Sequence, residues 1–214
     1  RRYAAGERNF VNIDLRGADL SRIDLSGIDL SGSKMSGASL RNTNLSGAKL
    51  YRVFLDEADL SRANLSRANL LYASLINANL NSAVLIQAEL SDADLRSANL
   101  DNVNLTNAIL YHTKFNDVSL RGANLDGANA RKATIARANL EGASLRKTDF
   151  SFAFITETTF RNANLEDADF GNDSDVGDVD FTGAVGVNPL NYFWSSITLP
   201  DGEFVKDTFE KNFI

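Results

Sequence analysis

The adjoining blocks Ala58-Asp59-Leu60-Ser61-Arg62 and Ala63-Asn64-Leu65-Ser66-Arg67 show the pattern that decides the fold. In both blocks a small residue comes first and a leucine comes third. The same period continues from Phe10 to Phe170 without a slip, as 33 consecutive pentapeptides. Leucine occupies 24 of the 33 central positions, and alanine occupies 21 of the 33 positions two residues earlier. Each pentapeptide therefore offers one small and one large side chain for burial.

A period of five residues matches neither standard secondary structure. On an α-helix each step of five residues rotates by about 500°, so the leucines would spread around the axis, and on a strand they would alternate between two faces. A turn after each pentapeptide removes the difficulty, because four turns close a square coil whose central residues all point to the axis. Residues two positions after the centre are often Gly or Asn, as at Gly27 and Asn42, and both tolerate the positive φ of a turn.

These units, together with Ala93-Asp94-Leu95-Arg96-Ser97, resemble the A(D/N)LXX motif of the pentapeptide repeat family. The resemblance covers residues 8–172 and rests on the large number of units. It implies an all-β fold, a right-handed quadrilateral β-helix, and the 33 units would make about eight coils of four units each. The segment from Tyr3 to Phe10 also resembles that of cyanobacterial members of the family.

The sequence predicts three segments. Residues 1–9 are expected to cap the first coil, residues 10–172 to form the β-helix, and residues 173–214 to form a loop and a C-terminal cap that includes a short helix. Caps are needed because the ends of a solenoid expose unpaired strands and apolar side chains.

The C-terminal segment is rich in aromatic residues. Those expected to cap the last coil, or to contact a second copy of the chain, are Tyr192, Phe193, Trp194, Phe204, Phe209 and Phe213. Val205, Phe209 and Phe213 stand four residues apart, which is the spacing of one helix face. The chain is accordingly expected to be a monomer, or a homodimer formed through this segment.

Composition excludes several classes of protein. The 214 residues include no cysteine and one histidine, so disulfides, thiolate metal sites and cysteine nucleophiles are ruled out. No apolar run is long enough to span a bilayer. No catalytic triad, phosphate-binding glycine loop or zinc-ligand spacing occurs, so we expect neither enzymatic activity nor a cofactor. His112 falls at a turn and is interpreted as a solvated residue.

Acidic residues fall into two groups. Asp or Asn directly before the central positions, as at Asp24 and Asn64, follow the repeat and are expected to accept hydrogen bonds in the turns. Four aspartates follow the last repeat: Asp173, Asp175, Asp178 and Asp180. Alternating oxygen ligands can hold Ca²⁺, but Gly177 stands where a ligand is needed and no glutamate closes the loop. A solvated acidic loop is the preferred interpretation, and no metal site is predicted.

Charge is unevenly distributed along the chain. Residues 1–170 contain equal numbers of basic and acidic residues, so the net charge of −6 lies in residues 171–214. The resemblance raises DNA mimicry, because family members that act on DNA gyrase imitate duplex DNA with an acidic rod. This balanced rod lacks that property overall. A DNA-mimicking regulator of a topoisomerase such as DNA gyrase remains the alternative function, since the charges can still segregate by face. No basic stripe predicts direct nucleic acid binding.

Large apolar residues at outward positions indicate a protein interface. They are Tyr51, Phe54, Leu71, Tyr72, Ile76, Val84 and Ile86. Tyr51 and Leu71 are twenty residues apart and should therefore stack in neighbouring coils, where they would begin a contiguous patch. Apolar residues scattered over a tolerant surface are the other interpretation. The predicted function is a non-enzymatic structural or interaction protein, a rigid rod that binds an unidentified protein partner through its surface or its caps.

The compartment is not indicated by the sequence. The first residue is Arg1 rather than Met. The cytoplasm is the default expectation, and the periplasm or the thylakoid lumen becomes the expectation if a leader was removed.

Overall fold

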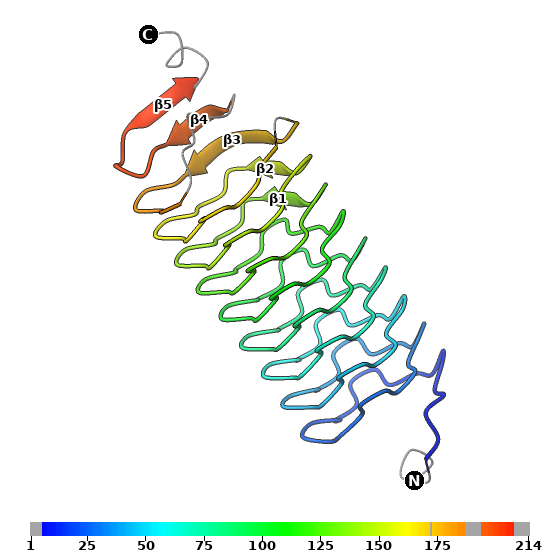
Figure 1. The fold of residues 1–214 in the computed structure, drawn as a ribbon. Helices are drawn as coiled ribbons and strands as arrows, with labels where there is room; N and C mark the ends of the chain where they lie inside the picture. The colour runs from blue at the N-terminus through cyan, green and yellow to red at the C-terminus, as the bar shows by residue number, and fades with distance from the viewer. Residues whose placement is uncertain (1–5, 172, 187–193, 208–214) are drawn as a thin grey trace.

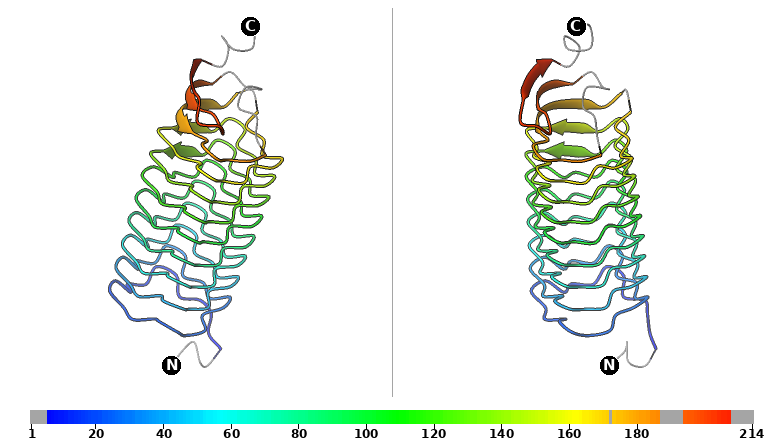
Figure 2. Two further views of the ribbon diagram at one scale, coloured as in Figure 1. Left: turned by 90° about the vertical axis from the view of Figure 1, so that its left-hand side faces the viewer. Right: turned by 60° about the vertical axis from the view of Figure 1, so that its left-hand side comes forward.

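The computed structural model describes residues 6–171, 173–186 and 194–207. Over these residues the chain winds into a rod of stacked four-sided coils (Figures 1 and 2). Parallel bridges join residues that are twenty apart, from the pair Asn9 and Asp29 to the pair Asp149 and Asp169. Each inner coil thus pairs with the coils above and below it, which confirms the predicted β-helix.

Where the residue before the centre is Asp or Asn, its side chain stabilises the turn that follows in many units. Asn64 Oδ1 accepts a hydrogen bond from the Ser66 N–H at 3.0 Å. The Ala68 N–H then donates to the Leu65 carbonyl at 3.0 Å and closes the turn. Arg67, inside this turn, has a φ of 58°, in the left-handed region. Many residues other than Gly and Asn occupy this position in other turns, each at a cost on the order of 1 kcal/mol.

The central residues fill the axis of the rod. From Leu30 to Phe170 every central residue is at most 2 % exposed, and the alanines between them complete the core. Some units have a hydroxyl at the alanine position. Thr113 Oγ1, for example, donates to the Leu90 carbonyl of the preceding coil at 2.9 Å. Among the described residues no buried side-chain polar atom lacks a hydrogen-bond partner, so the core is apolar and its few polar groups are satisfied.

Longer strands occur toward the C-terminal end. They are β1 (Thr134–Ala136), β2 (Phe154–Thr156), β3 (Asp175–Asp180), β4 (Ser195–Thr198) and β5 (Phe204–Asp207). The five strands form one sheet in chain order, in which β1 to β4 are parallel and β5 is antiparallel to β4. The described residues contain no helix of the length and apolarity that a membrane span requires.

The solenoid extends past residue 172, where the sequence analysis ends it. Phe154 in β2 pairs with Asp175 in β3, one residue further along than the twenty-residue spacing of the earlier coils. Val176 and Phe181 then take central positions and are buried. One additional residue therefore shifts the numbering of the repeat, whereas the pairing between coils and the inward direction of the central side chains continue.

Aromatic rings close the C-terminal end of the core. Trp194 is 2 % exposed. Its ring lies 4.8 Å from that of Phe170 and stacks 5.5 Å from that of Phe181, measured between centroids. Trp194 therefore lies against the last rings of the core, and the hairpin of β4 and β5 follows it (Figure 1).

The helix predicted to include Val205 is wrong for residues 204–207. Val205 lies in β5 and pairs with Ile197 of β4. Side chains in β5 alternate, so Val205 is buried whereas Phe204 is 62 % exposed and does not cover the coil. Pairing with an available strand edge satisfies the backbone of this segment, which overrides the helical spacing of its apolar residues. The other predicted cap residues lie outside the described residues: Tyr192, Phe193, Phe209 and Phe213.

The N-terminal end of the rod contains an apolar hollow of about 240 Å³. Its lining consists of Phe10, Ile13, Leu15, Leu20, Ile23, Leu25, Ile28 and Leu30. Leu15 and Leu20 are central residues, yet they are only partly buried. Most of the cap predicted for residues 1–9 falls on residues 1–5, outside the described residues.

Candidate protein-docking edge

Surface positions twenty residues apart form columns along the rod. We number the four faces from 1 to 4 in chain order, starting with the face centred on Leu50. The turn at Tyr51 and Arg52 lies between faces 1 and 2, on what we call the aromatic edge. The turn at Ser61 and Arg62 lies between faces 3 and 4, on the diagonally opposite arginine edge.

The structure places three of the seven predicted interface residues on the aromatic edge and a fourth, Phe54, on an adjoining face. Tyr51, Leu71 and Tyr72 occupy adjacent turns of the aromatic edge, and the rings of Tyr51 and Tyr72 meet edge to face with centroids 5.9 Å apart. Phe54 lies on the adjoining face 2 and is 46 % exposed. The pairing between coils thus produces an apolar group from residues that are twenty positions apart in the sequence.

The other three predicted residues lie elsewhere. Ile76 stands at the far side of face 2, and Val84 lies on face 4, which is opposite face 2. Ile86 stands between faces 4 and 1, where it lines a separate hollow of about 430 Å³ with Arg67 and Gln87. One continuous patch of seven residues does not form, because residues ten positions apart are half a coil apart.

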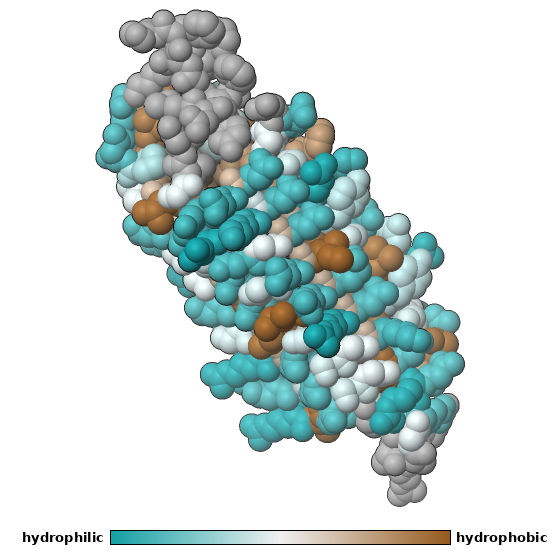
Figure 3. All heavy atoms as spheres, in the orientation of Figure 1, coloured by the Kyte–Doolittle hydropathy of each residue, from teal (hydrophilic) through white to brown (hydrophobic). Residues whose placement is uncertain are grey.

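Strongly exposed apolar side chains concentrate around the aromatic edge. Six of the nine exposed large hydrophobic side chains lie on this edge or on the two faces that meet there: Val11, Phe54, Tyr72, Ile109, Phe152 and Phe154. Ile23 and Val185 lie on face 4, and Phe204 lies in β5. Apolar side chains form separate patches in an otherwise hydrophilic surface on the side of the rod shown in Figure 3. Neighbouring exposed apolar side chains on one side of a surface are typical of an interface.

Cationic groups accompany the rings in the N-terminal half of this edge. The Arg52 guanidinium lies 5.1 Å from the ring centroid of Tyr51 and 5.6 Å from that of Tyr72. Arg52 is therefore held in a cation–π arrangement by rings from two neighbouring coils. Arginine and tyrosine side chains are also those most enriched among residues that dominate protein binding energies.

The same arrangement returns further along the rod. Lys132 Nζ lies 5.3 Å from the ring centroid of Tyr111, and the Arg131 guanidinium lies 5.2 Å from that of Phe152. In each pair the cation and the ring come from neighbouring coils. Four coils separate Arg52 from Lys132, which corresponds to about 19 Å along the rod.

An acidic residue lies between the two cationic groups. Asp92 Oδ1 is 2.6 Å from Nδ1 of His112, twenty residues later. His112 is exposed, as its position in a turn predicts, and its ring lies 6.4 Å from that of Tyr111. The sequence analysis did not predict the contact of His112 with Asp92. The one histidine thus belongs to the aromatic edge and has a carboxylate partner.

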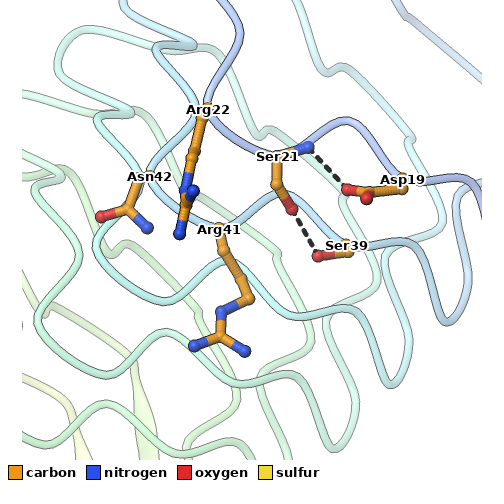
Figure 4. A pocket seen from close by; sticks show the side chains of 6 residues that line it. All are labelled: Asp19, Ser21, Arg22, Ser39, Arg41 and Asn42. Carbon is orange, nitrogen blue, oxygen red and sulfur yellow. Dashed lines mark hydrogen bonds between the residues drawn. The ribbon is translucent and has the colours of Figure 1, made fainter.

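The arginine edge carries a polar hollow near the start of the rod. Its volume is about 530 Å³, and its lining consists of Asp19, Ser21, Arg22, Ser39, Arg41 and Asn42 (Figure 4). The Ser21 N–H donates to Asp19 at 3.0 Å, and the hydroxyls of Ser21 and Ser39 are 2.6 Å apart. The serine and aspartate groups of this hollow therefore form hydrogen bonds with one another. No aromatic side chain is among the residues that line it.

Further along, arginines of this edge pair with carboxylates of neighbouring coils, as Arg121 and Arg161 do. Asp101 accepts hydrogen bonds from the Arg121 side chain at 2.9 Å and from the Ser119 hydroxyl at 2.5 Å. Burial raises the pKa of Asp101, but the hydrogen bonds from Arg121 and Ser119 outweigh burial and hold the pKa below its ordinary value. Arg161 is likewise 2.5 Å from Asp180. These pairs tie neighbouring coils together, which is a structural role.

No metal centre emerges within the described ranges. These residues contain no group of three or more His, Cys, Asp or Glu side chains placed to hold a metal ion. Asp175, Asp178 and Asp180 lie in β3, and Asp180 is engaged by Arg161 and by the Thr182 hydroxyl.

Sequence reasoning missed the cations of the aromatic edge and the rings of Phe152 and Phe154. These residues can be recognised in the sequence when the turns are compared in steps of twenty residues. That comparison places Tyr51–Arg52, Tyr111–His112 and Arg131–Lys132 in one column. Grouping by nearness in the sequence instead selected Ile76, Val84 and Ile86.

Family models match most of the chain. A model described as a pentapeptide repeat region matches residues 48–125 and 102–170, and one described as pentapeptide repeats (8 copies) matches residues 9–47. The chain belongs to the pentapeptide repeat family, and the stacked coils are the right-handed quadrilateral β-helix of that family.

Solved structures are similar to this chain. HetL, a pentapeptide repeat protein involved in heterocyst differentiation regulation from the cyanobacterium Nostoc sp. strain PCC 7120, is 34 % identical with a TM-score of 0.59, over 96 % of this chain and 97 % of HetL. Rfr23 from the cyanobacterium Cyanothece 51142 is 28 % identical with a TM-score of 0.36, over 57 % of this chain and 89 % of Rfr23. QnrB1, a plasmid-mediated fluoroquinolone resistance protein, is 20 % identical with a TM-score of 0.48, over 81 % of this chain and 89 % of QnrB1. No curated protein matches significantly.

Proposed function

We propose that this protein is a non-enzymatic interaction scaffold, a rigid rod that binds a protein partner along the aromatic edge. The observation that carries the proposal is the concentration of exposed apolar side chains there, between Phe54 and Phe154. HetL, which is 34 % identical, is involved in the regulation of heterocyst differentiation, a role that binding to a protein partner can serve. A partner that covers these rings removes apolar surface from water, which is the main favourable contribution to protein association.

The rod suits this role because its surface is preorganised. Tyr51 and Tyr72 project from turns whose backbones bond to the next coil, as the Arg52 N–H does to the Leu71 carbonyl at 3.0 Å. Few backbone torsions remain to be ordered on binding, so little conformational entropy is lost. The edge therefore presents several anchors at fixed spacing to one partner.

DNA mimicry toward a topoisomerase has weaker support. A protein that imitates a duplex needs regular columns of negative charge, but the column on face 4 changes from Asp24 to Asn44, Asn64 and Val84. On the arginine edge, carboxylates such as Asp101 are paired with arginines of the next coil. A gyrase supercoiling assay tests this alternative, and inhibition by the purified rod at a stoichiometric dose would favour it.

A capture experiment tests the docking function. The purified chain is immobilised and incubated with an extract of cells that contain the protein, and bound proteins are identified by mass spectrometry. The double variant Phe54→Ala/Tyr72→Ala is compared with Ile76→Ala/Ile86→Ala, which removes similar apolar side chains from other edges. We expect a protein that the parent and the Ile76/Ile86 variant retain, and that the Phe54/Tyr72 variant retains at least fivefold less.

The same experiment can refute the proposal. Equal retention by both double variants would place the docking surface away from the aromatic edge. Thermal unfolding and circular dichroism of each variant provide the control for folding, and all four replaced side chains lie outside the core, so both variants should fold.

A further inference from the structure

We propose that the partner of the aromatic edge is an acidic protein segment that lies along the rod and places carboxylates against Arg52 and Lys132. This inference rests on the proposed docking function and adds the chemistry of the partner. It starts from the way in which the structure holds these two cations.

Rings, rather than carboxylates, hold Arg52 and Lys132 in place. Arg52 lies against Tyr51 and Tyr72, and Lys132 lies against Tyr111. Among the described residues, no carboxylate is within ion-pair distance of Arg52 or Lys132, whereas Arg121 on the arginine edge is 2.9 Å from Asp101. A cation–π contact positions a cation without neutralising its charge. Both cations therefore keep a positive charge that an acidic partner can meet.

Apolar side chains next to these cations define the rest of the partner. Leu71 stands one coil after Tyr51 in the turns of this edge and directly precedes Tyr72, and Phe152 lies beside Arg131. A complementary segment thus carries both acidic and large apolar side chains. The two cations are about 19 Å apart along the rod, a span of about six residues of extended chain.

Single-stranded nucleic acid fits this edge less well. Stacking of bases needs free ring faces, but Arg52 lies over the rings of both Tyr51 and Tyr72. Asp92 interrupts the column of cations, and Arg131 already has Asp149 at 3.3 Å. A backbone of phosphates would meet these two carboxylates along the path, whereas a protein segment can place apolar or basic side chains opposite them.

The test uses two variants with equal changes in charge. Arg52→Gln/Lys132→Gln removes the proposed contacts, and Arg22→Gln/Arg62→Gln removes two positive charges from the arginine edge. All four residues occupy the same turn position, with φ between 53° and 61°, and Gln87 already occupies that position with a φ of 57°. The two variants therefore change the net charge by the same amount and place glutamine in the same strained turn position.

The probes are three labelled ten-residue peptide pools and a ten-nucleotide thymidine oligonucleotide. All pools share the same large apolar residues, and the remaining positions are Asp and Glu, Lys and Arg, or Ser and Gln. Fluorescence anisotropy at low salt measures binding. We expect only the acidic pool to bind the parent, with at least fivefold weaker binding to Arg52→Gln/Lys132→Gln than to the Arg22/Arg62 control, and a decline as salt is raised.

Three results would overturn the inference. They are absence of binding by the acidic pool, equal loss in both double variants, and tighter binding by the oligonucleotide than by the acidic pool. The docking function is tested separately with Phe54→Ala/Tyr72→Ala. If those alanines abolish capture of the natural partner while Arg52→Gln/Lys132→Gln leaves capture unchanged, the docking edge stands and its acidic partner does not.

Discussion

The two ends of the rod have the same repeat, but their central side chains are buried to different extents. At the N-terminal end, the central residues Leu15 and Leu20 border an apolar hollow and stay partly exposed. At the C-terminal end, Phe170 and Phe181 are fully buried because Trp194 lies against both rings. A central side chain is therefore buried by the coil that follows or precedes it, and the last coil needs a cap of different sequence.

The aromatic C-terminal end also packs differently from the leucine core in the rest of the rod. Leucines stack along the axis through most of the rod, but near the C-terminal end Phe150 stacks on Phe170 at 5.1 Å and Phe160 stacks on Phe181 at 5.3 Å. Phe160 and Phe170 meet edge to face at 6.5 Å. Such ring pairs add about 0.5–1.5 kcal/mol each beyond their burial. The C-terminal end should consequently depend on single residues more strongly than the N-terminal end does.

The largest expected effect comes from a charge placed at each end. Phe170→Asp puts a carboxylate among rings where no partner is available, at a cost of several kcal/mol. Leu15→Asp places the same group beside solvent, so its cost should be about 1 kcal/mol. Chemical denaturation followed by circular dichroism measures both. Equal losses would show that the N-terminal hollow is as closed as the C-terminal core.

Removal of the cap residue itself comes next. Trp194→Ala leaves Phe170 and Phe181 without their covering ring and should cost about 3–5 kcal/mol. A local loss is expected in the coils that contain β2 and β3, with less change near Leu30. Hydrogen exchange detected by mass spectrometry resolves the two regions. Uniform loss of protection along the rod would mean that the rod unfolds as one unit.

The sequence predicts the coils well because their cause is local and repeated. Each pentapeptide contains its own inward pair and its own turn acceptor, as the bond from Ser66 to Asn64 shows. The period also predicts stacking at twenty residues, which the pair of Asp101 and Arg121 confirms. Thirty-three repetitions leave no competing assignment for the central residues.

Features that depend on contacts outside the repeat are predicted less well. Val205 stands at helical spacing from later aromatic residues, but a strand edge offered by Ile197 decides its conformation. Val84 resembles Phe54 in type, but the thirty residues between them make one and a half coils, so the two lie on opposite faces. One additional residue before Asp175 interrupts the period of five, so the period alone does not predict the final coil. In each case the deciding neighbour is distant along the chain.

Acid should weaken the C-terminal end through Asp180. Burial raises the pKa of Asp180, but hydrogen bonds from Thr182 and Arg161 outweigh burial and lower the pKa below 3.8. A lowered pKa means that Asp180 stabilises the fold above its unfolded pKa of 3.8 and that this contribution is lost as the pH falls through the lower, folded-state pKa. Asp180→Asn should therefore cost about 1 kcal/mol at pH 7 and progressively less as the pH falls below 3.8.

The fluorescence of Trp194 reports on this end, because Trp194 is the one tryptophan of the chain. Denaturant titrations of the parent and of Asp180→Asn at several pH values then give the difference in stability. A difference that stays constant from pH 7 to pH 2 would assign the effect of the substitution to packing rather than to the charge of Asp180.

The smallest effect is expected from the matching ion pair at the N-terminal end. Arg16 is 2.6 Å from Asp14, and hydrogen bonds from Arg16 lower the pKa of Asp14 to about 2. Both side chains are largely exposed and belong to one turn, so the pair joins no two coils and is screened by salt. Arg161, in contrast, joins its coil to β3 through Asp180. Arg16→Ala should leave the melting temperature at 0.15 M salt unchanged within error, whereas Arg161→Ala should lower it measurably. A larger decrease for Arg16→Ala would show that the first coils depend on their surface charges, and that the N-terminal end is held by contacts other than those of its partly buried leucines.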